Sequence, residues 1–130
     1  MNELERTIET MNFHYFATGQ HKITPESFLQ SQDAVLLDVR SREETETIKF
    51  QLNHHAELLE IPAHEVPSRI AEIPGDKFIG VFCSSGIRSV MIFLYLQSKG
   101  YKNVKILDGG YNNLIAALMP GKIYKHINNS

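Results

Sequence analysis

One segment of the sequence combines a cysteine with residue types that activate a thiol. Cys83 directly follows the apolar run 77–82, and a strongly apolar stretch begins at Arg88. The four residues between them, SSGI, form a short polar loop, and its glycine can adopt backbone angles that other residues resist. Such a loop can turn several backbone N–H groups toward one anion.

The first anion that this loop would stabilise is the Cys83 thiolate. Backbone donors, the positive end of the following helix and the Arg88 guanidinium would act together on it. A free cysteine titrates near ~8.5, and helix N-termini and neighbouring cations lower that value by one to several units. We therefore predict a reactive nucleophile. The alternative for a lone cysteine after a strand is a buried apolar side chain.

The pattern along the chain predicts the elements that position this loop. Short apolar runs alternate with longer amphipathic ones, which is typical of repeated βα units around a mainly parallel sheet. We expect strands at 34–39, 57–61, 77–82 and 104–107, and helices at 25–30, 41–48, 63–73, 88–98 and 111–119. Ligands of such sheets bind beyond the carboxyl ends of the strands, which is where Cys83 stands.

Two charged residues end the first of these strands, at the same edge as Cys83. We expect Asp38 to fix loop geometry by accepting hydrogen bonds, and Arg40 to reach the pocket or to pair with Glu43 or Glu44. We assign both a supporting role and neither a catalytic one.

Local signals mark several helix ends. Thr24 can cap a helix whose first position is Pro25, where a missing N–H does no harm. Ser41 and Glu44 form a capping box, and Gly100 suits a left-handed C-terminal position.

Composition bounds the class of protein. The chain has 130 residues, 42% hydrophobic and 22% charged, which predicts one soluble globular domain. Its single cysteine cannot form an internal disulfide, unlike the cysteines of a disulfide-stapled secreted protein. The net charge of −2, with scattered basic residues, argues against nucleic-acid binding. No apolar run suits a signal peptide or a membrane span, so a cytoplasmic location is expected.

The beginning of the chain is predicted to be an addition to this domain. An early helix has apolar residues at helical spacing, and an aromatic patch follows it: Leu4, Ile8 and Met11, then Phe13, Tyr15 and Phe16. We expect this extension to cover one side of the sheet, with partner binding as the alternative. The predicted organisation is an extension at 1–21, a main domain at 22–122 and a tail at 123–130.

The cysteine loop resembles the C-x-x-G-x-R-S active-site signature of single-domain rhodaneses. The likeness extends from about Ile23 to the last helix and includes four further segments: ITP at 23–25, LLDVR at 36–40, KGY-NV at 99–104 and LDGGY at 107–111. The resemblance implies a rhodanese-like three-layer α/β fold, with a mainly parallel sheet of four to five strands and helices on both faces.

The resemblance also implies a sulfurtransferase. Sulfur would pass from thiosulfate, a persulfide or a polysulfide through a Cys83 persulfide to a thiol or cyanide. Cys83 would be the nucleophile, and the substrate-binding loop would consist of Ser84, Ser85, Gly86, Ile87, Arg88 and Ser89. Arg88 would support either the loop or an anionic substrate. A persulfide needs these donors and no metal or organic cofactor.

Three alternatives remain beside this enzyme. Related phosphatases and arsenate reductases use one more residue between cysteine and arginine, so the four residues here favour sulfur over phosphate. A sulfur-carrier or docking module would instead exchange sulfur with a protein partner, with the aromatic extension as the partner surface. A silent scaffold is disfavoured because Cys83 and Arg88 are intact.

The sequence departs from the family pattern in two places. The family's G-H-I-P-G-A segment is replaced by QLNHHA at 51–56, in which His55 could match the family histidine. Adjacent histidines invite a metal site, but no second ligand cluster lies nearby. The usual tryptophan after the G-G turn is absent, and Tyr111 and Leu114 stand there instead. Ile87 could line the entrance, which would favour a bulky persulfide donor.

Overall fold

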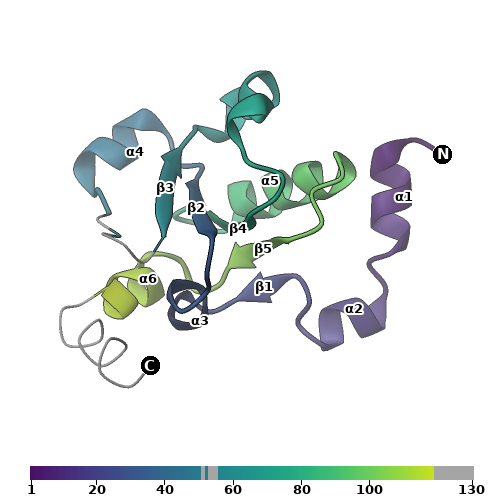
Figure 1. Cartoon of the computed structure of the whole chain (residues 1–130), viewed down its shortest axis with the longest axis horizontal. Helices are drawn as coiled ribbons and strands as arrows, with labels where there is room; N and C mark the ends of the chain where they lie inside the picture. Colours follow the sequence, from purple (N-terminus) through teal and green to yellow (C-terminus); the bar gives the residue numbers. More distant parts are fainter. Residues whose placement is uncertain (51, 53–55, 119–130) are drawn as a thin grey trace.

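The centre of the computed structural model, which describes residues 1–50, 52 and 56–118, is a five-stranded sheet. Its order is β1-β5-β4-β2-β3, and all four strand pairings are parallel (Figure 1). The strands are β1 (Lys22–Ile23), β2 (Ala34–Asp38), β3 (Glu57–Glu60), β4 (Phe78–Phe82) and β5 (Val104–Leu107). The four predicted strands are confirmed to within one residue. The two-residue β1 is too short to show any apolar alternation and was not predicted.

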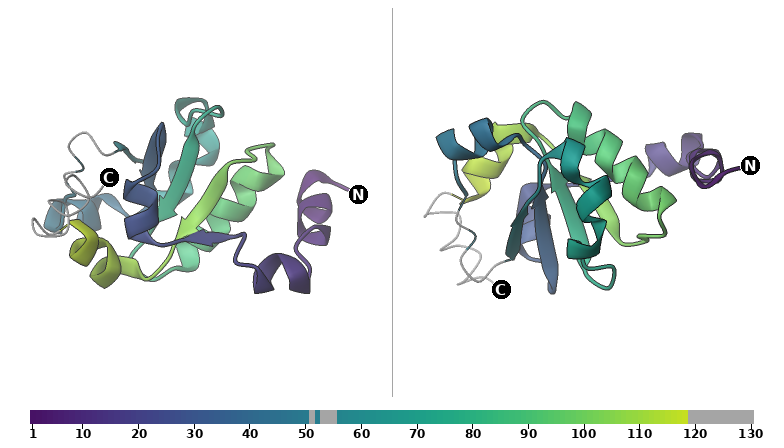
Figure 2. Two further views of the ribbon diagram at one scale, coloured as in Figure 1. Left: turned by 60° about the horizontal axis from the view of Figure 1, so that its bottom comes forward. Right: turned by 90° about the horizontal axis from the view of Figure 1, so that it is seen from above.

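Helices cover both faces of the sheet, as predicted (Figure 2). Alternate side chains of β2 and β4 enter two separate cores because successive residues of a strand point to opposite faces. One core packs against α5 (Ile87–Ser98) and two short 3₁₀ helices, η1 (Ala63–Glu65) and η2 (Pro67–Glu72). The other packs against α3 (Pro25–Leu29) and α6 (Gly110–Leu118). The three-layer α/β architecture is therefore confirmed.

The structure confirms the predicted helix ends, two by hydrogen bonds and one by a backbone angle. The Thr24 hydroxyl accepts from the Ser27 N–H at 3.2 Å, with Pro25 in the first turn. The capping box opens α4 (Arg42–Thr47), where the Ser41 N–H donates to Glu44 at 3.0 Å. Gly100 has a φ of +93° after α5. These contacts are local, which is why the sequence predicts them.

The helix predicted over 63–73 is wrong in type. Those residues form η1 and η2, and Arg69 has a non-helical φ of −118°. Pro67 has no N–H to donate to the carbonyl of Ala63 four residues earlier, so this stretch uses i→i−3 bonds such as Arg69 N to Val66 O. The last predicted helix, 111–119, begins one residue early at Gly110, and its end at 119 lies outside the described residues.

The N-terminal extension forms two helices, α1 (Glu3–Glu9) and α2 (Phe13–Ala17), where one was expected. The expectation that it covers the sheet is not met by α1, which packs on α5 (Figure 1). Met11 and Tyr15 instead contact the core. Among the described residues, no helix has the length and apolarity needed to cross a membrane.

The close approach of α3 to the sheet depends on Gly80 in β4. A Cβ atom at Gly80 would lie 2.6 Å from Cε1 of Phe28, whose side chain is fully buried. Gly80→Ala should therefore lower the free energy of unfolding by about 1–3 kcal/mol, the usual effect of overpacking. Urea unfolding followed by circular dichroism measures it. Gly75→Ala is the control, because its Cβ would meet Tyr101 at an ordinary 3.9 Å.

A cysteine loop as the candidate active site

The Cys83 sulfur lies in a cradle of backbone N–H groups where β4 ends and α5 begins. Sγ accepts from the Gly86 N–H at 3.0 Å and from the Ser89 N–H at 3.2 Å. Gly86 caps α5 with a φ of +90°, a left-handed conformation that residues with a Cβ rarely adopt. Only 2% of Cys83 is exposed. The predicted inward-facing loop therefore exists around the thiol.

Two opposing influences act on the pKa of Cys83. Burial is the largest and raises the pKa, but hydrogen bonds from the Ser89 side chain and from the N–H groups of Ser89, Gly86 and Ser85 outweigh it. The pKa of the thiol is thus lowered from its ordinary value. The single hydroxyl hydrogen of Ser89 has two acceptors in reach, the thiolate and the Gly86 carbonyl at 2.9 Å.

Arg88 points to a carboxylate from another element. Its guanidinium donates to both oxygens of Glu44, at 2.5 and 3.0 Å, and to the Ser84 hydroxyl at 3.0 Å. Ser84 in turn donates to Glu44 at 2.8 Å. Glu44 therefore binds both ends of the cysteine loop to α4. These hydrogen bonds, that from Arg88 foremost, hold the pKa of Glu44 far below its usual range.

Sequence reasoning recognised Glu44 only as a helix-capping residue and as a candidate partner of Arg40. The available signal was its position, because α4 follows β2 and β2 is the sheet neighbour of β4. An acid in the first turn of α4 thus lies at the same sheet edge as the cysteine loop. The actual partner, Arg88, could not be chosen from sequence because the two residues are 44 positions apart.

Arg40 does not reach the loop pocket. Its side chain is fully buried and bound to Asp38, with a closest N–O distance of 2.7 Å. It also donates to the Tyr111 hydroxyl at 3.0 Å and to the Ile48 carbonyl at 2.8 Å. The rings of Phe50, Phe82 and Tyr111 surround the guanidinium, with centroids 4.6 to 5.6 Å away. Glu43 and Glu44 are not its partners.

This buried pair joins three elements at one sheet edge. Asp38 pairs in register with Phe82, the residue before Cys83. Arg40 links the end of β2 to the residue after α4 and to the start of α6. Tyr111, at the place of the family tryptophan, supplies both a ring and a hydroxyl to it. The supporting position predicted for Asp38 and Arg40 is thus beneath the site rather than in it.

A cavity of about 490 Å³ opens over the thiol. Its walls come from the cysteine loop, the end of β5 and the region of β1: Cys83, Ser84, Ser85, Gly86, Val90, Ile106, Leu107, Asp108, Gly109, Gly110, His21 and Lys22. Ile87 is 69% exposed and outside this lining. Arg88 lines a smaller neighbouring cavity with Ser41 and His64. The structure therefore brings Cys83 together with the front half of the predicted loop.

The histidine pair His54 and His55, with its proposed family match, lies outside the described residues. Within the part of the chain that the structure describes, no three His, Cys, Asp or Glu side chains are grouped as a metal site would require.

The hydrogen-bond donors to Sγ lower the pKa of the thiol, and the pH dependence of alkylation measures this shift. We expect the rate of iodoacetamide alkylation of Cys83 to rise with a midpoint below ~8.5, the value of a free thiol. Ser89→Ala should move the midpoint upward, because it removes a hydroxyl donor. Ser98→Ala is the matched control. The Ser98 hydroxyl likewise donates to a carbonyl of α5, that of Tyr95 at 2.6 Å, but Ser98 is the last residue of α5, whereas Cys83 precedes the helix. Equal midpoints in wild type and Ser89→Ala would contradict this assignment.

The Glu44 carboxylate should stabilise the fold through Arg88. Glu44→Gln should lower the free energy of unfolding by about 1 kcal/mol, whereas exposed Glu43→Gln should have little effect. Because the pKa of Glu44 is lower in the folded state, its contribution is present above the unfolded carboxyl pKa of about 4.3 and is lost as the pH falls. Urea midpoints of both variants at several pH values measure it. A difference between the two variants that does not shrink as the pH falls below about 4.3 would exclude the ion pair.

Comparisons with known proteins agree with this architecture. A family model described as a rhodanese-like domain matches residues 24–117. A sulfurtransferase from Allochromatium vinosum is 34% identical over 80 residues, which are 62% of this chain and 70% of the relative. Several tRNA sulfurtransferases are 32% to 36% identical, and the matched part is only 15% to 18% of their length.

Two solved structures extend the likeness. A rhodanese-related protein from Thermoplasma volcanium has a TM-score of 0.63 at 23% identity, covering 77% of this chain and 95% of that one, and so shares the fold. An NAD-dependent persulfide reductase from A. fulgidus has a TM-score of 0.58 at 36% identity, covering 75% of this chain and 16% of that one. With a family model matched over most of its length, this chain belongs to the rhodanese-like domain family and is a homologue of sulfurtransferases.

Proposed function

We propose that the protein transfers sulfane sulfur through a persulfide on Cys83. The observation that supports this most directly is the cradle of N–H groups around Sγ, with donors at 3.0 and 3.2 Å. A thiolate formed there has donors in place of water. In this proposal residues 22–122 form the catalytic unit, and residues 1–21 are an extension of it.

The transfer needs no oxidant or reductant. The Cys83 thiolate attacks the outer sulfur of the donor, a new S–S bond forms to Cys83, and the donor's own S–S bond breaks. The bond electrons leave with the donor, as sulfite from thiosulfate or as a thiolate from a persulfide. The acceptor, a thiol or cyanide, then attacks the outer sulfur on Cys83 and restores the thiolate.

The loop is suited to both states of the cysteine. The thiolate carries its charge on Sγ, whereas the persulfide carries it one atom further out, in the cavity above. Ser84, Ser85 and Gly86 line this cavity, which supports a role of these residues in binding the outer sulfur. Arg88 supports the loop rather than the substrate in this mechanism, because Glu44 occupies its donors.

The charges near the cavity favour a persulfide donor over thiosulfate. Glu44 neutralises Arg88, and Lys22 lies 3.7 Å from the carboxylate of Asp108. Burial, with Lys22 nearby, lowers the pKa of His21, so its imidazole is neutral at pH 7. A dianion such as thiosulfate therefore meets little net positive charge. The 36% identity to a persulfide reductase is consistent with this preference.

Intact-mass spectrometry tests the proposal. After incubation with glutathione persulfide, the purified protein should gain about 32 Da, one sulfur atom, and cyanide should remove it. Thiosulfate should load the protein more slowly. Cys83→Ser should gain nothing from either donor. If neither donor adds sulfur while iodoacetamide still alkylates Cys83, the proposed function is wrong.

A further inference from the structure

The outward face of α5 is apolar, although it begins at the candidate active site. Ile92, Phe93 and Leu96 are buried against the sheet, as expected for the inner face of such a helix. The opposite face should be polar but carries an apolar stripe at i, i+3, i+4 and i+7, formed by Ile87, Val90, Met91 and Leu94. Ile87, Val90 and Met91 are 69%, 50% and 62% exposed. Neighbouring exposed apolar side chains of this kind indicate an interaction site.

The apolar stripe connects two hollows of the surface. Val90 lines the cavity above Cys83. Met91 and Leu94 line a groove of about 760 Å³ between α1 and α5. From Ile87 to Leu94 the helix rises about 10 Å, so one short segment of a partner can span the whole stripe.

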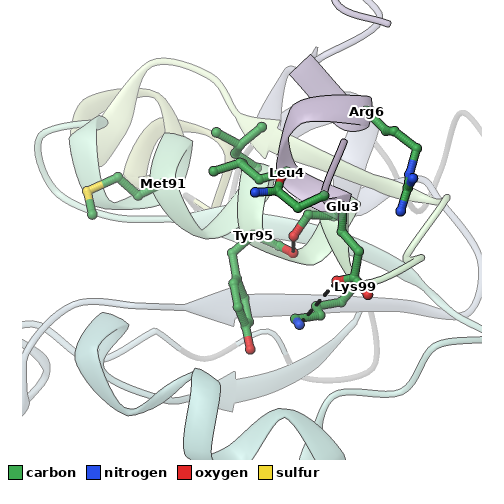
Figure 3. A pocket seen from close by; sticks show the side chains of 9 residues that line it. Glu3, Leu4, Arg6, Met91, Tyr95 and Lys99 are labelled. Carbon is green, nitrogen blue, oxygen red and sulfur yellow. Dashed lines mark hydrogen bonds and ion pairs between the residues drawn. The ribbon is translucent and has the colours of Figure 1, made fainter. Parts of the chain in front are cut away.

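The groove itself has an apolar floor and a charged rim (Figure 3). Leu4 of α1 and Tyr95 of α5 line it, and Lys99 is held by Glu3 at 3.2 Å and lies over the Tyr95 ring. Arg6 stands at the rim, away from Met91 (Figure 3), and within the described ranges its guanidinium has no ion pair. An occupant would thus combine apolar side chains for the floor with a carboxylate for Arg6.

We propose that the apolar stripe and the α1–α5 groove dock a protein that exchanges persulfide sulfur with Cys83. This inference rests on the proposed function. The docking segment is amphipathic, with apolar side chains along the stripe and an acidic residue at Arg6, and its cysteine lies at the Val90 end, at the cavity. The sulfur passes as described above, with the partner's persulfide as donor and its thiolate as leaving group.

Continuity with the cavity favours such a partner over a second copy of this chain. A second copy on the stripe would cover Val90 and close the cavity over Cys83 to donors. A relay partner uses that opening instead. The stripe offers only a few side chains, which suits the small interfaces of transient complexes.

Synthetic peptides of about 12 residues provide the probe. The first peptide carries leucines at i, i+3, i+4 and i+7, an aspartate at the end that reaches Arg6, and a cysteine persulfide at the other end. The second peptide has serines in place of the leucines and is otherwise identical. Intact mass should show that the leucine peptide loads wild-type Cys83 about 10-fold faster than the serine peptide, a difference of about 1.4 kcal/mol. Met91→Glu should abolish this difference and leave loading by glutathione persulfide unchanged. Ile115→Glu, at an exposed apolar position of α6, is the matched control and should behave as wild type.

The charge contact and the alternatives have their own tests. Arg6→Glu should slow the leucine peptide, and a peptide with lysine in place of aspartate should restore the rate. Equal loading by both peptides, or slower glutathione persulfide loading in Met91→Glu, overturns the docking site. So does a dimer in sedimentation that Met91→Glu dissociates. If glutathione persulfide fails to load the wild-type protein, the proposed function is wrong. The docking site is then tested separately by fluorescence anisotropy, which measures binding of the labelled peptides in their thiol forms.

Discussion

A thiolate on a cysteine residue that is only 2% exposed is stable only where fixed donors replace the solvent, and this constraint governs the sheet edge at Cys83. The donors are the Gly86 and Ser89 N–H groups, which are free because the first N–H groups of a helix have no partner within it. They converge on Sγ because Gly86 takes a positive φ and because β4 ends one residue before Cys83. The chemistry of the thiol therefore depends on backbone geometry together with the Ser89 hydroxyl.

Two ion pairs hold that geometry, and their surroundings differ. Asp38 and Arg40 are fully buried, so each nitrogen of the guanidinium needs a partner, and the Asp38 carboxylate, the Tyr111 hydroxyl and the Ile48 carbonyl supply them. Glu44 and Arg88 are about 30% exposed and join the loop to α4. The buried pair joins the elements beneath the loop, whereas the partly exposed pair restrains the loop itself. Removing one partner of the buried pair would leave a charge without solvent, so that pair tolerates substitution least.

Whether a feature can be predicted from the sequence depends on how far apart along the chain its interacting residues lie. Thr24, the Ser41–Glu44 capping box and Gly100 act within a few residues, and their roles are readable from spacing. The parallel sheet follows from alternating apolar runs, and Cys83 follows from its place after one of them. The partners of Arg88 and Arg40 depend on which strands are neighbours, so spacing alone does not reveal Glu44 as the partner of Arg88 or Tyr111 as a partner of Arg40. The prediction of an α-helix over 63–73 is wrong because Pro67 changes the hydrogen bonds of this segment from i→i−4 to i→i−3 without changing the spacing of its apolar residues.

The charge distribution is consistent with the two roles proposed for α5. A rhodanese-type site that relied on loop cations would attract any small dianion, but here Glu44 neutralises Arg88, which agrees with the proposed selection by shape and apolar contact. The first turn of α5 supplies donors for the sulfur, and its outward stripe begins at Ile87, in that same turn. In this proposal, apolar contact with the stripe places the donor beside the cavity, without attraction to a loop cation. In the proposed mechanism, selectivity arises from the neighbouring surface, because the backbone N–H groups and the Ser89 hydroxyl of the cradle contact the sulfur and not the molecule that carries it.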